Sequence, residues 1–216
     1  MICWPREGPH VHHAATDRDR LCAALNFAIG TIVYLVKLPI YLDSVGTILC
    51  ALLLAPARWA AFVCACVAGT IGVIITAPIN PYLPWFWFTV VAIALVSAFL
   101  TVEGAEVYRA RPMRIGPFAW RVVFYGVVTG VVAAVVSAPV VAYLFGGVTG
   151  SGSTFIVALF LKAGQDLLNA ALYSGLTHEP IDKPLQVLLA ALLYRATPKD
   201  FIAMLQASEP AQQMPR

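Results

Sequence analysis

The chain has 216 residues, of which 60% are hydrophobic and only 12% are charged, and its mean hydropathy is +0.81. A water-soluble domain of this length cannot bury so much apolar surface, so the composition excludes a soluble globular protein. The net charge of +3 is small and comes from arginines near the ends of apolar runs, which excludes a nucleic-acid interface and points to a role in membrane topology.

Six apolar runs follow one another along the chain, and we predict that each forms a membrane-spanning helix. The first three cover residues 21–38, 45–55 and 59–79. Because the second is short for a span, the segment before it, residues 39–44, is expected to dip into the membrane edge, where protein covers its backbone.

The last three runs cover residues 85–102, 118–145 and 154–176. A glycine- and serine-rich loop at 146–153 precedes the sixth run, and a shorter helix is expected around 184–194. The sequence therefore predicts an all-α integral membrane protein that folds as a six-helix bundle.

Positive charges predict the orientation of this bundle in a plasma or bacterial inner membrane. With both termini in the cytoplasm, most basic connections lie inside, Lys183 among them, and the uncharged turns near Asn80 and 146–153 lie outside. The expected organisation is a cytoplasmic tail at 1–20, a membrane domain at 21–197 and a second cytoplasmic tail at 198–216.

Cysteine and histidine give little support for metal or catalytic chemistry. The five cysteines have neither a CxxC pair nor a metal-binding spacing, so they are interpreted as small apolar residues. His10, His12 and His13 belong to a solvated tail or, alternatively, bind a transition metal. Since these and His178 all lie outside the apolar runs, we expect no catalytic residue, no metal and no cofactor in the membrane.

The middle of the sixth run carries the clearest candidate binding residues. Charged side chains inside a membrane helix cost about 2.5–3.5 kcal/mol each on insertion scales, so they are functional candidates. Helical spacing places four polar residues on one face near the bilayer midplane: Lys162, Gln165, Asp166 and Asn169. The alternative is a self-neutralising pair of Lys162 and Asp166 that only holds helices together.

Further candidates lie at the predicted outer face. Lys37, Tyr41 and Asp43 belong to the connection pinned by Pro39, which is either a binding segment or an ordinary hydrated connector. Asn80 lies in the uncharged turn before the fourth run. Trp85 opens that run in an aromatic cluster, which stacks on a ligand or anchors the helix at headgroup level.

Several of these segments together resemble a known family. The stretch LPIYLDSVGT at 38–47, the GSGS loop at 150–153 and the Asp182-Lys183 pair are similar to the substrate-binding S components of energy-coupling factor (ECF) vitamin transporters. The resemblance implies a six-helix bundle that holds a vitamin or other small nutrient near the outer face. It also implies a partner, a transmembrane coupling subunit driven by two ATPases.

The resemblance assigns roles to residues of this chain. Ala24 and Ala28 match an AxxxA pattern at which the coupling subunit docks, and the segment with Tyr41 and Asp43 matches a loop that covers the substrate. The sixth run matches a wall of the pocket. The expected function is nutrient capture for ATP-driven uptake, without catalysis and without nucleic acid as a partner. The alternative is a membrane sensor module resembling the input region of a sensor kinase.

Overall fold

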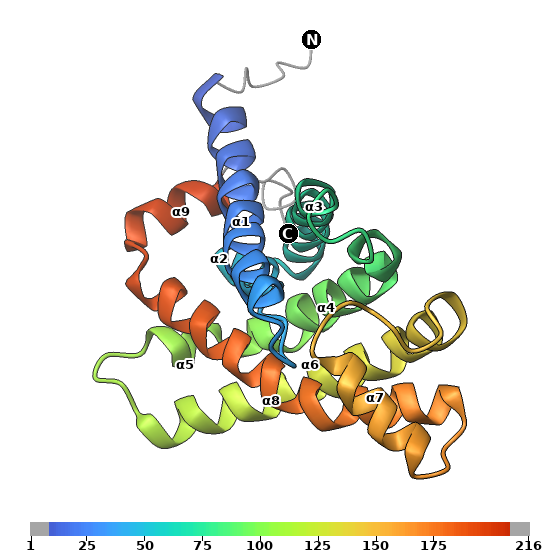
Figure 1. Ribbon diagram of the computed structural model, residues 1–216. Helices are drawn as coiled ribbons and strands as arrows, with labels where there is room; N and C mark the ends of the chain where they lie inside the picture. Colours follow the sequence, from blue (N-terminus) through green and yellow to red (C-terminus); the bar gives the residue numbers. More distant parts are fainter. Residues whose placement is uncertain (1–8, 208–216) are drawn as a thin grey trace.

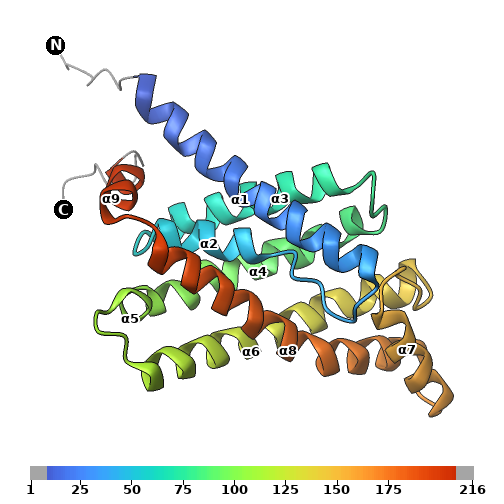
Figure 2. The same cartoon turned by 60° about the vertical axis from the view of Figure 1, so that its left-hand side comes forward.

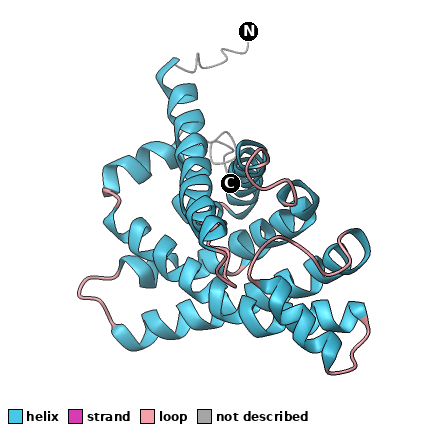
Figure 3. Cartoon of the chain, viewed as in Figure 1, coloured by secondary structure: helices cyan, strands magenta, loops and turns pink. Residues whose placement is uncertain are grey.

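The computed structural model describes residues 9–207, with side chains described for residues 17–206, and this part of the chain is helical without strands (Figures 1 and 3). Four helices are long and apolar enough to cross a membrane: Asp17–Val36, Arg58–Thr76, Leu83–Arg109 and Ile115–Leu144. They correspond to the first, third, fourth and fifth apolar runs. The prediction of an all-α chain with membrane-embedded helices is thus confirmed, whereas a count of six spans is not.

Nine α-helices make up the described chain (Figure 1). They are α1 (Pro9–Val36), α2 (Val45–Leu53), α3 (Arg58–Thr76), α4 (Trp87–Phe99), α5 (Ala105–Arg109), α6 (Ile115–Pro139), α7 (Ser153–Lys162), α8 (Leu167–Ala196) and α9 (Lys199–Ala207). A 3-10 helix, Leu83–Phe86, precedes α4, another, Thr101–Gly104, follows it, and a π-helical turn, Val140–Leu144, extends α6. Helix α1 begins at Pro9, so residues 9–20, expected as a tail, continue the first helix.

Helix α2 is a short, fully buried helix held by α1. All nine of its residues are buried, and nine residues cannot cross a bilayer. A Cβ on Gly46 would lie 1.8 Å from the carbonyl oxygen of Cys22, so only glycine permits this approach of α1 and α2. Asn26 of α1 accepts the Gly46 backbone N–H at 2.7 Å and donates to Thr47 Oγ1 at 2.9 Å. Glycine and threonine of the GT dipeptide at 46–47 therefore serve packing.

A disulfide joins α2 to α3, which corrects the interpretation of all five cysteines as small apolar residues. Cys50 and Cys64 are bonded, while Cys22 and Cys66 are free, and Cys3 lies outside the described residues. The two partners are 14 residues apart in sequence. Sequence spacing gave no sign of the bond because the pairing depends on how α2 folds back along α3.

The sixth apolar run is not one helix, contrary to the prediction. Helix α7 ends at Lys162 and α8 begins at Leu167. Between them Gly164 has a φ of +87°, a conformation that residues with a side chain rarely adopt, and the chain turns there. Asp166 caps the new helix by accepting the backbone N–H of Asn169 at 3.3 Å.

Helix α8 then continues for 30 residues through Pro180 and Pro184, so the separate helix expected around 184–194 does not exist. It lies along α6 (Figure 2). A Cβ on Gly126 would lie 2.3 Å from Pro184 Cα, and one on Gly130 would lie 2.6 Å from the Glu179 carbonyl oxygen. Glycines of α6 thus allow the proline-containing part of α8 to pack at very close range.

The two ends of the molecule differ in charge. At one end Arg58 pairs with Glu103 at 2.9 Å, and Arg195 donates to the Ala110 carbonyl oxygen at 2.8 Å. At the other end three connections without arginine meet, namely those between α1 and α2, between α3 and α4, and between α6 and α7. Lys37 donates to the Gly150 carbonyl oxygen at 2.7 Å, and the ring of Tyr82 packs on that of Phe145. Figure 2 shows α5 and α9 at the first end and α7 at the second.

Candidate functional site: a cavity beneath loop 37–44

A cavity lies at the end where the connections without arginine meet. It contains about 1210 Å³ of empty space, including its open mouth, and is lined by α1, α2, α3, α4, α6, α7 and α8 together with the loops. The connection between α1 and α2, which we call loop 37–44, contributes Leu38, Ile40, Tyr41, Asp43 and Ser44 to the lining. Its placement between the helices of a bundle is typical of a small-molecule site.

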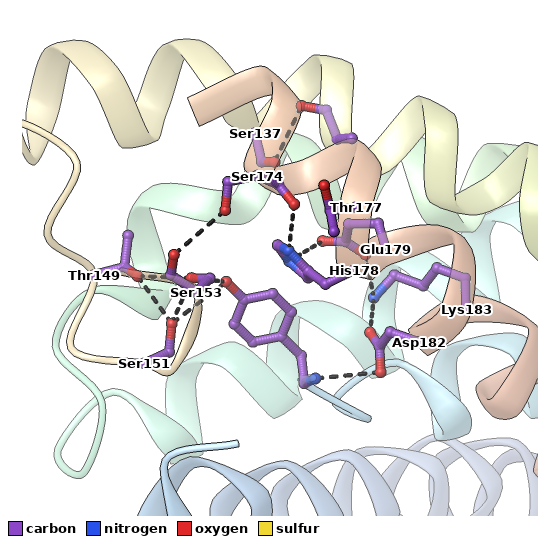
Figure 4. Close-up of polar contacts among 12 residues, drawn as sticks. Ser137, Thr149, Ser151, Ser153, Ser174, Thr177, His178, Glu179, Asp182 and Lys183 are labelled. Atoms are coloured by element: carbon purple, nitrogen blue, oxygen red, sulfur yellow. Dashed lines mark hydrogen bonds and ion pairs between the residues drawn. The ribbon is translucent and has the colours of Figure 1, made fainter. Parts of the chain in front are cut away.

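Helix α8 brings a buried cluster of charged side chains to the cavity (Figure 4). The ammonium group of Lys183 lies 2.9 Å from Asp182 Oδ2, 3.2 Å from Glu179 Oε2 and 3.8 Å from Asp43 Oδ1. Lys183, Glu179 and Asp182 are each exposed by 5% or less. One ammonium thus faces three carboxylates, an arrangement that requires each charge to have well-placed partners because desolvation is costly.

Asp182 is the anchor of loop 37–44. Its Oδ1 accepts the backbone N–H groups of Tyr41 at 3.2 Å and Leu42 at 3.1 Å, and its Oδ2 accepts from Gln186 at 2.7 Å. Gln186 in turn accepts the N–H of Ser44 at 3.1 Å. The loop needs this hold because Leu42 has a positive φ of 49°, which is unfavourable for a residue with a side chain. Two side chains of α8 therefore fix the loop over the cavity.

Hydroxyl groups hold the other side of the loop. The hydroxyl of Tyr41 lies 2.8 Å from Ser153 Oγ, which is itself 2.8 Å from Ser151 Oγ, and Thr149 completes the cluster at 2.9 Å from Ser151. A Cβ on Gly152 would lie 2.5 Å from the Lys37 carbonyl oxygen, so glycine lets this segment pack against the loop.

His178 is the least satisfied polar group of the site. Its ring lies against Tyr41 with centroids 5.4 Å apart, and its Nδ1 is 2.6 Å from the Ser174 carbonyl oxygen. Its Nε2 is buried and has no hydrogen-bond partner among the described residues; Glu179 Oε1 lies 3.8 Å away. Because a carbonyl only accepts, Nδ1 carries the proton and Nε2 presents a lone pair.

The outer-face candidates are partly brought together. Tyr41, Asp43 and Asn80 all line the cavity, whereas Lys37 and Trp85 do not. The Lys37 ammonium is directed to the Gly150 carbonyl oxygen and lies 4.1 Å from the centre of the Tyr34 ring. Trp85 is 57% exposed, which suits the alternative of an anchor at the membrane surface.

The polar stripe predicted for the sixth run is wrong in its geometry. Lys162 and Asp166 are exposed at the junction of α7 and α8, and neither they nor Gln165 and Asn169 line the cavity. Lys162 ends one helix and Asp166 caps the next, positions at which their charges suit the helix dipoles. The Asn169 backbone N–H lowers the pKa of Asp166. These residues mark helix ends at a chain turn rather than a buried wall.

Sequence reasoning missed the part of α8 that carries the site. Lys183 was counted as a cytoplasmic charge and His178 as a residue outside the membrane helices, yet both line the cavity. The reason given against histidine chemistry is therefore wrong for His178. A signal was present, because the polar residues recur at helical spacing: Ser174, His178, Glu179, Asp182, Lys183 and Gln186. Ending the sixth run at residue 176 and starting a separate helix near 184 concealed it.

The described residues contain one group of close potential metal ligands, Asp19, Cys50 and Cys64, and its two sulfur atoms are already bonded to each other. His10, His12 and His13 have no described side chains. Comparison of the chain with protein-family models, with curated proteins and with solved structures found no match. The cavity and the side chains around it are therefore the features from which a function can be inferred.

Proposed function

We infer that this chain is the substrate-binding membrane subunit of an ECF-type transporter and captures a small water-soluble nutrient for ATP-driven uptake, without catalysing a reaction itself. The observation that carries the proposal is the cavity beneath loop 37–44, whose wall includes the buried Glu179 and Lys183. Buried charges destabilise a fold unless they are paired or serve a ligand, and those of α8 lie where a ligand would bind.

The hydrogen bonds that hold loop 37–44 over the cavity support a site that captures a substrate rather than a channel that lets it pass. Asp182 and Gln186 bind the backbone of loop 37–44, while Tyr41 binds Ser153 on the other side. These contacts are hydrogen bonds between polar groups that water can satisfy in an open state, so the loop can open at modest cost. A substrate would enter from the end of the molecule at which loop 37–44 lies.

The outer face of α1 supports a partner interface. Ala24 and Ala28 are exposed one turn apart, and the large apolar side chains of Leu21 and Ile32 on the same helix are 62% and 64% exposed. Small residues one turn apart allow another helix to approach closely. In the proposed assembly this face meets the coupling subunit, which carries two ATPases.

The proposed topology has six crossings with both termini in the cytoplasm of a plasma or inner membrane. Four crossings are the long apolar helices, and the other two would be α2 with loop 37–44 and α8. The arginine-rich end, with Arg58 and Arg195, would then face the cytoplasm as the distribution of positive charge favours.

The test replaces both Ala24 and Ala28 with leucine in cells that co-express the chain with an ECF coupling subunit and its ATPases. Two bulky side chains should prevent close helix contact, so we expect loss of co-purification and a fall in ATP-dependent nutrient uptake of more than tenfold. The thermal stability of the purified variant should stay at the wild-type value because both positions are exposed.

The matched control changes Ala119 and Val123, which are one turn apart and exposed on α6, to leucine in the same way. This variant should keep both co-purification and uptake. Unchanged uptake in the α1 variant would overturn the proposed docking face, and absence of uptake by the wild-type assembly would overturn the proposed function.

A further inference from the structure

The polar groups that face the cavity from α8 and loop 37–44 are unbalanced in charge. Asp43 and Glu179 line the cavity, and Asp182 lies directly behind Lys183. Three carboxylates therefore share one ammonium, and a proton on His178 would still leave the acids in excess. Lys37 does not change this balance at the wall, since its ammonium is directed to the Gly150 carbonyl oxygen.

The three carboxylates differ in how fully their oxygens are hydrogen-bonded. Asp182 is satisfied on both oxygens, by two loop N–H groups on one side and by Gln186 and Lys183 on the other. Glu179 has only the shared Lys183 within 3.2 Å. Asp43 accepts a hydrogen bond from Ser44 at 3.1 Å and lies 3.8 Å from the same ammonium. Glu179 and Asp43 thus retain acceptor capacity, whereas Asp182 has none to offer.

His178 adds an independent observation that also points to a ligand with donor groups. The side chain is only 7% exposed, lines the cavity and has an Nε2 without a hydrogen-bond partner. In the neutral ring, with its proton on Nδ1, this Nε2 can only accept. A bound donor would therefore satisfy an acceptor that no described residue satisfies.

We propose that the cavity binds a small organic cation, an alkylammonium group attached to an aromatic or heteroaromatic ring, whose N–H groups reach Glu179, Asp43 and His178 Nε2. This inference rests on the proposed function and names its substrate class. An anionic substrate would meet two carboxylates against one ammonium at the wall, in a site of low dielectric where like charges repel strongly.

The same geometry disfavours a metal ion as the occupant. The centre of the three carboxylates already holds the Lys183 ammonium. The remainder of the lining suits an organic body, because it includes the rings of Tyr82 and Phe86 and the side chains of Val90 and Ile93. Aromatic faces attract cations as well as apolar groups.

The test uses three water-soluble probes that share one ring and differ in charge: 3-(aminomethyl)pyridine, 3-pyridylmethanol and nicotinate. Calorimetric titration of the purified full-length chain should show the ammonium probe binding at least tenfold more tightly than the alcohol, with nicotinate weakest. In Glu179→Gln the advantage of the ammonium over the alcohol should fall by about 10- to 100-fold, the range expected for one charge-assisted hydrogen bond.

Two further variants keep the test decisive. Asp43→Asn removes a half-buried carboxylate that is not needed to neutralise Lys183, so it should fold and lose part of the same advantage. Glu106→Gln removes an equal charge from an exposed side chain of α5 and should change nothing.

Equal or tighter binding of the alcohol or nicotinate would overturn the cation inference and leave the proposed function standing. An ammonium preference that survives in both Glu179→Gln and Asp43→Asn would overturn it as well. If no probe binds, the cation inference fails, and nutrient uptake by the wild-type assembly decides separately on the proposed function.

Discussion

Two lysine–carboxylate sites of similar composition and opposite character lie at the start of α8 and in its middle. At its N-terminal junction Lys162 and Asp166 are exposed, and each charge lies at a helix end. Four turns further on, Lys183 and Asp182 are buried, and Asp182 binds a loop that is 140 residues away in sequence. Hydropathy alone misplaces both sites, because it puts the first in the middle of an apolar run and the second in a connection.

The difference shows that the meaning of a charge in a membrane protein depends on what packs around it. A charge at a helix end keeps water within reach and gains from the helix dipole, so it costs little. A charge in the middle of a packed helix must be paired, which ties it to other segments. Three pairs of matched substitutions can break or sharpen this contrast.

The largest difference is expected between the two lysines. Lys183→Met leaves Asp43, Glu179 and Asp182 without their common partner, and removing one member of a buried pair costs about 3–5 kcal/mol. Lys162→Met removes an exposed charge and should change the free energy of unfolding by no more than about 0.5 kcal/mol. Denaturant unfolding in detergent measures both. If the two substitutions changed the free energy of unfolding equally, the charged side chains around Lys183 would be hydrated rather than buried.

A smaller contrast is expected between the two aspartates. Asp182→Asn keeps the shape but weakens the bonds to the N–H groups of Tyr41 and Leu42, at a cost of about 1–3 kcal/mol. Hydrogen exchange at these two amides should become at least tenfold faster, because loop 37–44 opens more often. Unchanged exchange would mean that the hydroxyl cluster alone holds the loop.

Asp166→Asn is the control, and its effect should depend on pH. The pKa of Asp166 is lower in the folded chain than its ordinary value of 3.8, so its stabilising effect is complete above that value and is lost as the pH falls below it. The midpoint of thermal unfolding should therefore differ slightly from wild type at pH 7 and converge with it in acid. If the difference in unfolding midpoint grew as the pH fell, the Asp166 carboxylate would not be stabilising α8 as its N-cap.

The smallest contrast concerns two glycines. Gly164→Ala forces a side chain into a φ of +87° at the turn between α7 and α8, at a cost of about 1–2 kcal/mol. Gly116 lies in the first turn of α6 with open space around it, so Gly116→Ala should be neutral or stabilising by up to about 1 kcal/mol. If both changes were equally harmless, the sixth apolar run would be able to form one continuous helix after all.

The sequence by itself determined that the chain is helical and membrane-embedded, because the length and hydropathy of an apolar run are local properties. It located four of the long helices, and it placed Tyr41, Asp43 and Asn80 among the candidates that line the cavity. These residues were found because they interrupt or connect apolar runs, which is visible without knowing the packing.

Only the tertiary structure decided which charges belong to the site. The cost of a charge depends on its burial, and burial of Glu179 and Lys183 follows from α6 and loop 37–44, which lie far away in sequence. The turn at Gly164 and the passage of α8 through Pro180 and Pro184 likewise depend on neighbours that supply close packing. The sequence shows where polar residues and prolines occur. The residues that pair with the buried charges and pack against the prolines are brought together only by the fold.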